Sequence, residues 1–444
     1  MRVQQDCCSP RRIQTGSNLR IDPSLRRAHS RGTDKEKKEP ETQFSVIGKL
    51  EGAVSRVQVA QGGVKKLVNS LEQMRAFLEE GGMRITEGID SVDVINNYLK
   101  EQLKQIEEIS DDCSFKGLGL LNGESGVVGT TSHQDLKFVR GSARVISSGT
   151  PGYPVSIKQS PKATSLLGTE PVSSDLLKKE STIALIEGDQ QIRYQLRKDE
   201  NPESLIQNLQ ECLLNHGVDI RVTRTEDNRL LFVHNQLGRG PSFFGFSLNT
   251  RMVSAQPGEV KLSTPGRNIV GTIGREKAEG TGGFLIGSRG NRHTDGLILY
   301  YNGNISYPGE IVGYVQVKQN GIYIPLDATG ENGELLSIPS CHPAAQAVGV
   351  SNASALASLG AIKTNTREQA RDSLKLILWA IADLKQLQDE LKWKEEGYIN
   401  RTIELLQGSV RPLTAGNEIM DLSDDRAGEM ADQLKDMLLP GVVA

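Results

Sequence analysis

The chain has 444 residues, enough for about three domains of ordinary size. Its 52 lysines and arginines nearly balance its 55 aspartates and glutamates, and the formal net charge of -3 excludes the basic footprint of a nucleic-acid-binding protein. No stretch approaches the roughly 18 consecutive apolar residues of a transmembrane helix. The five cysteines are widely spread and indicate neither a disulfide framework nor a zinc cluster.

The first 43 residues are polar and carry a dense run of charges from Asp34 to Glu39. Because they show almost no apolar periodicity, we predict a disordered arm over residues 1–43. The opening ten residues also lack the apolar core of a secretory signal peptide. Cys7 and Cys8 are adjacent in this arm, but no neighbouring base activates them, so an incidental pair is favoured over a reactive one.

Apolar residues recur at spacings of three and four over residues 44–82, which predicts a long helix with one buried stripe, here called a seam. Gly62 and Gly63 are expected to weaken this helix, and Gly81–Gly82 are expected to end it. The heptad positions of its seam are Leu50, Val57, Val64, Leu71 and Leu78.

A second helix is predicted from about Ile89 to Ser110. Its apolar face includes Leu99 and Ile106. Since each of the two helices has one apolar face to bury, residues 44–116 are predicted to form a helical hairpin.

Residues 117–359 are dense in glycine, proline, serine and asparagine. Short alternating apolar runs between turn residues predict a β-rich region, with two subdomains at about 150–255 and 256–345. One helix is expected inside this region, over residues 202–215. The clearest predicted strands are Thr182–Ile186, Leu230–Val233 and Leu297–Tyr301.

Heptad periodicity returns over residues 367–406 and is predicted to continue through Tyr398 and Leu405. Polar residues take the second seam position after Ile381, so the stripe narrows, as in a helix that packs on a bundle. A last short amphipathic segment is expected over residues 426–439. The predicted seam residues here are Leu374, Ile377, Ile381, Leu384 and Leu391.

Together these elements predict an α+β fold. Residues 360–444 are expected to form a C-terminal helical segment that packs on residues 44–116. The result is a long antiparallel, coiled-coil-like helical bundle with the β-rich region inserted between its halves. Both a rod-forming subunit and a monomeric bundle with an inserted domain satisfy this pattern.

Enzyme motifs are missing from the sequence, which has no His-Glu-x-x-His, Gly-x-Ser-x-Gly, phosphate loop or Cys-x-x-Cys. The six histidines lie far apart and are expected in solvated loops. Gly280–Gly283 and Asp327–Glu334 lack the dinucleotide and calcium-loop spacings and are expected to be turns. We therefore expect no enzyme, no cofactor and no metal site.

Strings at both ends of the chain resemble those of bacterial flagellins. Residues 12–21 are similar to a region near the flagellin start, and residues 54–78 to the helical segment that follows. Residues 106–123 resemble the family's Glu-Ile and Phe-Asn-Gly-x-x-Leu-Leu-x-Gly strings, with Lys116 in place of asparagine. Residues 419–430 are similar to the C-terminal string Ser-x-Ile-x-Asp-x-Asp-x-Ala-x-Glu-Met.

The middle of the chain resembles the filament-cap protein, another member of the flagellar axial set. Residues 153–159 are similar to a strand of that protein, and residues 204–240 to the short repeat of hook and cap proteins. Further similar strings lie at residues 269–274, 280–283 and 296–303.

The resemblance implies a structural subunit of the bacterial flagellum, flagellin-like or hook-associated, that assembles through its terminal helices. Its partners would be other axial subunits (itself, flagellin, hook-associated or cap proteins) and an export chaperone. It would be exported unfolded through the flagellar secretion apparatus, without a cleaved signal peptide, to an extracellular place in the flagellum. The chain departs from flagellins in its polar start, in Arg26–Arg27 with its charged surroundings, and in its short end after Pro440. These departures favour a minor or junctional subunit.

A different interpretation treats the β-rich region as a surface-exposed adhesin or glycan-binding module on an oligomerising helical stalk. An enzyme within that region has the least support, because catalytic groups do not cluster in the sequence.

Overall fold

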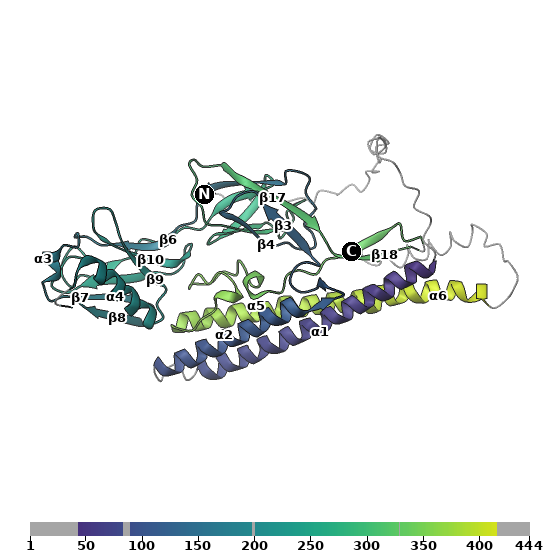
Figure 1. Ribbon diagram of the computed structural model, residues 1–444, viewed down its shortest axis with the longest axis horizontal. Helices are drawn as coiled ribbons and strands as arrows, with labels where there is room; N and C mark the ends of the chain where they lie inside the picture. The colour runs from purple at the N-terminus through teal and green to yellow at the C-terminus, as the bar shows by residue number, and fades with distance from the viewer. Residues whose placement is uncertain (1–42, 83–88, 198–199, 328, 415–444) are drawn as a thin grey trace, which may run out of the picture. The chain divides into compact units, whose positions relative to one another are not determined.

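A computed structural model describes residues 43–82, 89–197, 200–327 and 329–414. The predicted arm at 1–43, apart from its last residue, lies outside these ranges, as do Cys7, Cys8 and the predicted segment 426–439. Within them the class is α+β, as predicted, because helices lie at both ends of the described chain and a large β-rich region lies between (Figure 1).

Two N-terminal helices, α1 (Gln43–Gly82) and α2 (Ile89–Asp112), contact each other, and α1 ends at the predicted Gly82. The C-terminal helix α5 (Arg367–Lys392) continues through a π-helical turn, η5 (Trp393–Ile399), into α6 (Asn400–Thr414). Helices α1 and α5 run in opposite directions. Gln58 bonds to Glu395 (Nε2 to Oε1, 2.6 Å), whereas Glu72, further along α1, pairs with the earlier Lys385 (2.8 Å).

Helix α1 is continuous through the two central glycines. Gly63 lies against the segment that follows α2. A Cβ atom on Gly63 would lie 2.6 Å from Leu121 Cδ1 and 2.7 Å from Cys113 Sγ, whereas one on Gly62 would meet nothing within 4 Å. Glycine at position 63 therefore permits a close approach to the helix and does not mark a break.

The heptad pattern predicts that Leu405 lies on the buried face. Instead Leu405 is 37% exposed, and the neighbouring Leu406 is buried. The π turn explains this difference. A π turn accommodates one extra residue, so every side chain after it is rotated relative to a continuous α-helix. Tyr398 and Ile399 are both buried at the turn, and the buried face then continues through Thr402 to Leu406.

An eight-stranded antiparallel sheet has the strand order β3-β17-β5-β13-β14-β15-β16-β4. Its edge strands β3 and β4 contact each other, and a core that includes Val155, Leu299 and Val315 fills one face. The strands are β3 (Val127–Thr131), β4 (Leu136–Arg140), β5 (Tyr153–Gln159), β13 (Val270–Ile273), β14 (Glu276–Thr281), β15 (Phe284–Gly287), β16 (Ile298–Tyr301) and β17 (Glu310–Gln319).

A separate core joins helix α4 (Pro202–Asn215) to a three-stranded sheet, β6-β10-β9, and a four-stranded sheet, β12-β11-β7-β8. Helix α4 has the predicted bounds, and Asn201 caps its first turn through a reciprocal pair of bonds with Ser204. The other elements are β6 (Ala163–Leu167), α3 (Ser174–Leu177), β7 (Thr182–Glu187), β8 (Gln190–Gln195), β9 (Ile220–Arg224), β10 (Leu230–Leu237), β11 (Phe243–Ser247) and β12 (Lys261–Leu262).

The strands group differently from the two expected subdomains. Strand β5, expected within 150–255, pairs with β13 and β17 of the eight-stranded sheet, and β3 and β4 precede both expected ranges. Pairing between strands far apart in sequence decides this grouping, and local periodicity carries no information about it.

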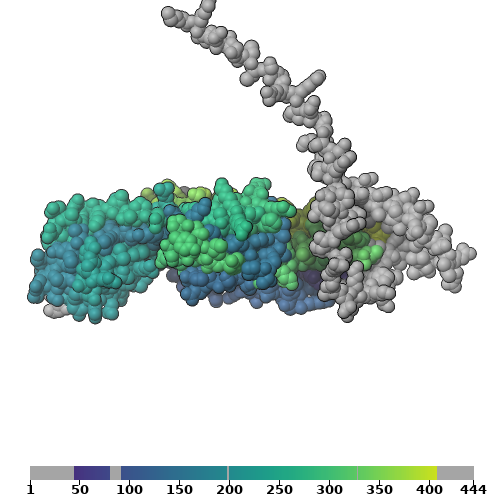
Figure 2. Space-filling model, turned by 90° about the horizontal axis from the view of Figure 1, so that it is seen from above, coloured from purple at the N-terminus to yellow at the C-terminus, as the bar shows by residue number. Residues whose placement is uncertain are grey.

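Short elements complete the described chain. Two of the expected turns lie between paired strands: Gly282 and Gly283 connect β14 to β15, and the β18–β19 hairpin is closed by the pairing of Pro325 with Gly333. Teal and green residues of the β-rich region make up most of one molecular surface (Figure 2). No described helix is long and apolar enough to span a membrane.

The short elements are β1 (Ser114–Phe115), β2 (Leu118–Gly119), β18 (Ile322–Pro325), β19 (Gly333–Leu336), η3 (Pro343–Ala345) and η4 (Leu359–Ala361).

Candidate assembly site

The predicted seam residues lie together in one hydrophobic cluster formed by α1, α2 and α5. All of them are buried in it except Leu374, which is partly buried and packs against it. The cluster includes Leu50, Val57, Val64, Leu71, Leu78, Leu99, Ile106, Leu374, Ile377, Ile381, Leu384 and Leu391. Because these side chains pack within one chain, they are not free to contact a second subunit.

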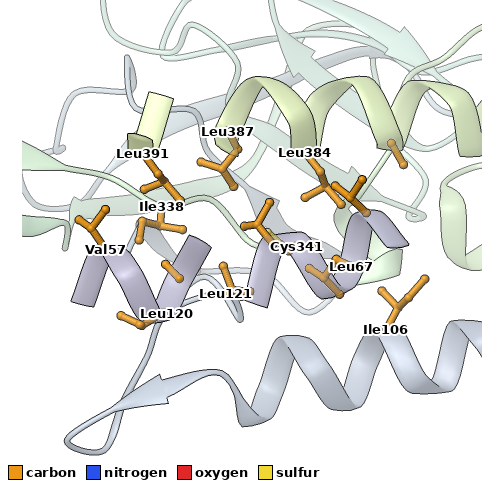
Figure 3. Close-up of a cluster of buried hydrophobic side chains, with 14 of the residues drawn as sticks. Val57, Leu67, Ile106, Leu120, Leu121, Ile338, Cys341, Leu384, Leu387 and Leu391 are labelled. Carbon is orange, nitrogen blue, oxygen red and sulfur yellow. The ribbon is translucent and has the colours of Figure 1, made fainter. Parts of the chain in front are cut away.

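The β-rich region contributes to the same cluster (Figure 3). Leu120 and Leu121 follow β2, and Ile338 and Cys341 follow β19; Ile338 and Cys341 lie between α1 and α5, and Leu120 and Leu121 lie on the α2 side of α1. These four residues were not predicted to lie in the helical core. The apolar pair Leu120–Leu121, directly after Gly117-Leu118-Gly119, was a signal that this segment is buried. Burial raises the pKa of Cys341 to about 12, which keeps this thiol protonated and unreactive.

A buried lysine lies where the π turn meets β19. Lys394 pairs with Glu334 (Nζ to Oε1, 2.6 Å) and lies 5.2 Å from the ring centre of Trp393 and 5.5 Å from that of Tyr398. Ion pairing and two aromatic faces together compensate for removing the ammonium group from water. This contact ties the β18–β19 hairpin to the C-terminal helix.

Both tryptophans of the chain are more than half exposed, Trp379 by 57% and Trp393 by 60%. They are two heptads apart, so they lie on nearly the same face of the C-terminal helix. Leu378, beside Trp379, is also exposed. Exposed indole side chains are typical of a surface that another protein covers.

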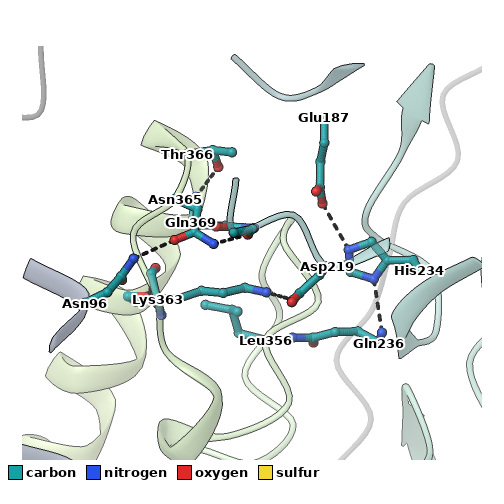
Figure 4. A network of polar contacts seen from close by, with 12 residues as sticks. Asn96, Glu187, Asp219, His234, Gln236, Leu356, Lys363, Asn365, Thr366 and Gln369 are labelled. Atoms are coloured by element: carbon teal, nitrogen blue, oxygen red, sulfur yellow. Dashed lines mark hydrogen bonds and ion pairs between the residues drawn. The ribbon is translucent and has the colours of Figure 1, made fainter. Parts of the chain in front are cut away.

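Polar side chains join the segment before α5 to the α4-containing unit and to α2 (Figure 4). Lys363 forms an ion pair with Asp219, and the Asn365 side chain donates to the Gly217 carbonyl. On the other side, the backbone amide of Thr364 donates to Asn96 Oδ1 (2.9 Å). Hydrogen bonds and one ion pair thus connect this segment to the α4-containing unit on one side and to α2 on the other.

His234 corrects the expectation that every histidine is solvated. It lies in strand β10, is 1% exposed, and its Nε2 is 3.0 Å from Glu187 Oε1. Its Nδ1 accepts from the backbone amide of Gln236 (3.1 Å), so Nε2 is the nitrogen that donates to the carboxylate. Its position in an alternating apolar strand was the signal that it would be buried.

A cavity of about 290 Å³ lies where the β14–β15 turn meets the end of β10 and residues 351–357. Its wall includes Arg239, Asn268 and Tyr300, whose ring centre is 4.9 Å from that of Phe284. The buried Gln236 Oε1 in this wall has no hydrogen-bond partner within the described ranges. The lining therefore combines amides, a guanidinium group and an aromatic face, which suits a small hydroxyl-rich ligand.

Across the part of the chain that the structure describes, no group of three or more His, Cys, Asp or Glu side chains is placed to hold a metal ion.

Solved structures that are similar to this chain include two flagellar proteins. FliC from Burkholderia pseudomallei is 11% identical, with 77% of this chain and 97% of that chain covered and a TM-score of 0.23. Flagellar hook-associated protein 3 from Legionella pneumophila is 10% identical, with coverages of 84% and 96% and a TM-score of 0.23. These scores are too low to establish a shared fold. No family model and no curated protein matches the chain.

Proposed function

We propose that this protein is a structural subunit of the bacterial flagellum, a flagellin-like or hook-associated axial protein that assembles with other axial subunits. The observation that carries the proposal is the burial of the seam of α1 against that of α5. Helices α1 and α5 thus share one helical core, and the β-rich region lies between them in the sequence. The strings at residues 12–21, 106–123 and 419–430, which resemble flagellins, support the same function.

The proposal includes a domain division. Residues 44–116 and 360–444 form a long antiparallel, coiled-coil-like bundle, and residues 117–359 form an insertion that faces outward. Export in an unfolded state, with an export chaperone, would precede folding at the flagellum. The opposed directions of α1 and α5 support the bundle, and the polar contacts around Lys363 support attachment of the insertion.

Immunogold electron microscopy of intact flagella tests the proposal. An antibody against this chain should label the shaft, the hook junction or the tip, and cells that lack the chain should show no label. Label confined to the cell body of flagellated cells would contradict a role in the flagellum.

A glycan-binding function is the second candidate, and the cavity beside Tyr300 is the observation that favours it. The full chain, folded and labelled, is applied to an array of mucin-type and acidic glycans. Binding that is lost in Arg239→Ala and Tyr300→Ala would support this function. No binding by the unaltered chain would leave only the structural function.

A further inference from the structure

Lys363 and Asp219 form an ion pair that is largely hidden from water. Their side chains are only 16% and 28% exposed. Lys363 lies just before α5, and Asp219 lies at the start of β9, so the pair joins two segments that are distant in sequence (Figure 4). Withdrawing two opposite charges from water is unfavourable, and their mutual attraction offsets this only in part.

Backbone contacts hold both residues in place. Ser373 Oγ accepts from the Lys363 amide (3.0 Å) and donates to the Lys363 carbonyl (2.7 Å). The Asp219 carbonyl accepts from the amide of Asn235 (2.7 Å). Gly217 precedes Asp219 with a φ of 65°, and a Cβ atom there would lie 2.8 Å from Asn365 Nδ2, so glycine allows this approach. The amine and the carboxyl group are therefore fixed at contact, which favours a reaction between them.

The surroundings favour an uncharged amine. Burial lowers the pKa of Lys363 to about 8, although the nearby charge of Glu187 acts in the opposite direction. Glu187 is itself buried, and His234 holds its Oε1 at 3.0 Å. The net effect is that the Lys363 amine loses its proton more readily than an exposed lysine does.

We propose that Lys363 and Asp219 condense into an intramolecular amide bond that links the segment before α5 to the start of β9. Proton transfer within the ion pair gives a neutral amine and a neutral carboxylic acid. The Nζ lone pair attacks Asp219 Cγ, a new C–N bond forms, and the C–OH bond breaks. The nitrogen gives up one proton, which leaves with the hydroxyl group as water. No oxidant or other reactant is required.

Condensation also replaces a poorly solvated ion pair with a neutral amide. The product would fasten the α4-containing unit to the helical core by a covalent bond. Such a bond would persist under a pulling force that separates ordinary hydrogen bonds. This inference does not depend on the proposed function, because it concerns chemistry within one chain.

Mass spectrometry of the folded, full-length chain tests the proposal. The mass under denaturing conditions should be lower than that of the sequence by one water molecule. A tryptic digest should contain one branched peptide that joins the segment of Asp219 to that of Lys363, with no cleavage after Lys363. A folded chain with the full sequence mass and two separate peptides would overturn the proposal.

Variants assign the roles. Lys363→Arg keeps the positive charge but should retain the full mass. Because processing at the chain ends would change both proteins equally, the mass difference between them, corrected for the substitution, measures condensation alone. Asp219→Asn should lose one ammonia instead of one water and give the same branched peptide. The pair of Lys385 and Glu72, whose lysine is 54% exposed, is the control and should give no branched peptide.

Discussion

Gly63 determines how closely α1 approaches the segment after α2. The added Cβ of an alanine would overlap Leu121 and Cys113, which lie in a packed core with little room to move. At Gly62, one position earlier, the same atom meets open space. Alanine substitutions at these two neighbouring glycines therefore distinguish the effect of helix propensity on stability from the effect of packing.

We predict that Gly62→Ala increases the free energy of unfolding by about 0.5–1 kcal/mol, because alanine is the better helix former. Gly63→Ala has the same gain in propensity but should be less stable than Gly62→Ala by about 1–3 kcal/mol, because it overfills the core. Chemical denaturation of both variants measures the difference. Equal stabilities would show that α1 is not closely packed at this point.

Glu276 is predicted to make stability depend on pH. Its Oε2 accepts from the amide (2.9 Å) and hydroxyl (2.7 Å) of Thr294, and its Oε1 accepts from the amide of Arg292 (3.1 Å). Burial opposes ionisation, but the bonds from Thr294 and His293 outweigh it and hold the pKa of Glu276 below the usual 4.5. The carboxylate therefore stabilises the folded state fully above pH 4.5, and this contribution is lost as the pH falls through the lowered pKa.

Glu276→Gln should thus lower the free energy of unfolding by roughly 1–3 kcal/mol at neutral pH, since an amide nitrogen replaces an acceptor. The difference from the unaltered chain should shrink below pH 4.5. Urea denaturation at several pH values measures it. A difference that is constant with pH would contradict a role for the ionised group.

At the scale of elements, the first and last residues of the helices could be predicted well from the sequence. Which side chains face the core was predicted less well after the π turn. The start and end of α4 followed from Pro202 and the leucine spacing, and the end of α1 from Gly82. The π turn was missed because a heptad count assumes a constant rotation per residue. Its signal was present, since Ile399 and Leu406 are each one position beyond the heptad of Ile377 and Leu391.

The buried faces of α1 and α5 depend on each other. Leu384 is fully packed in the shared cluster, so Leu384→Ala should lower the free energy of unfolding by about 2–5 kcal/mol. Val64→Asp combined with Leu384→Asp should prevent folding altogether, because two carboxylates would be buried without partners. Leu378→Ala, on the exposed side of α5, is the control and should change stability by less than about 0.5 kcal/mol. Thermal denaturation followed by circular dichroism distinguishes these outcomes.

For the whole molecule, the sequence indicated which ends hold helices and where β structure lies, because both have a local period. It did not indicate that β5 would pair with β13 and β17, or that Leu121 and Cys341 would join the helical core. Those contacts form between segments far apart in the chain. The burial of the predicted seam within one chain also changes how assembly can be tested, since unfolding of a seam variant would by itself prevent polymerisation.

Assembly should instead depend on apolar groups that the folded chain leaves exposed. We predict that Trp379→Lys combined with Trp393→Lys weakens assembly, because two exposed indole surfaces are lost. The melting temperature should fall only modestly, because Trp393 is one of several groups beside the Lys394 ammonium group. The matched variant with phenylalanine at both positions keeps much of the apolar surface and should assemble more like the unaltered chain. Sedimentation and electron microscopy of the purified protein compare the three forms. Full assembly of the lysine variant would exclude this helix face as the contact, and loss of folding in that variant would show that the tryptophans act within the subunit.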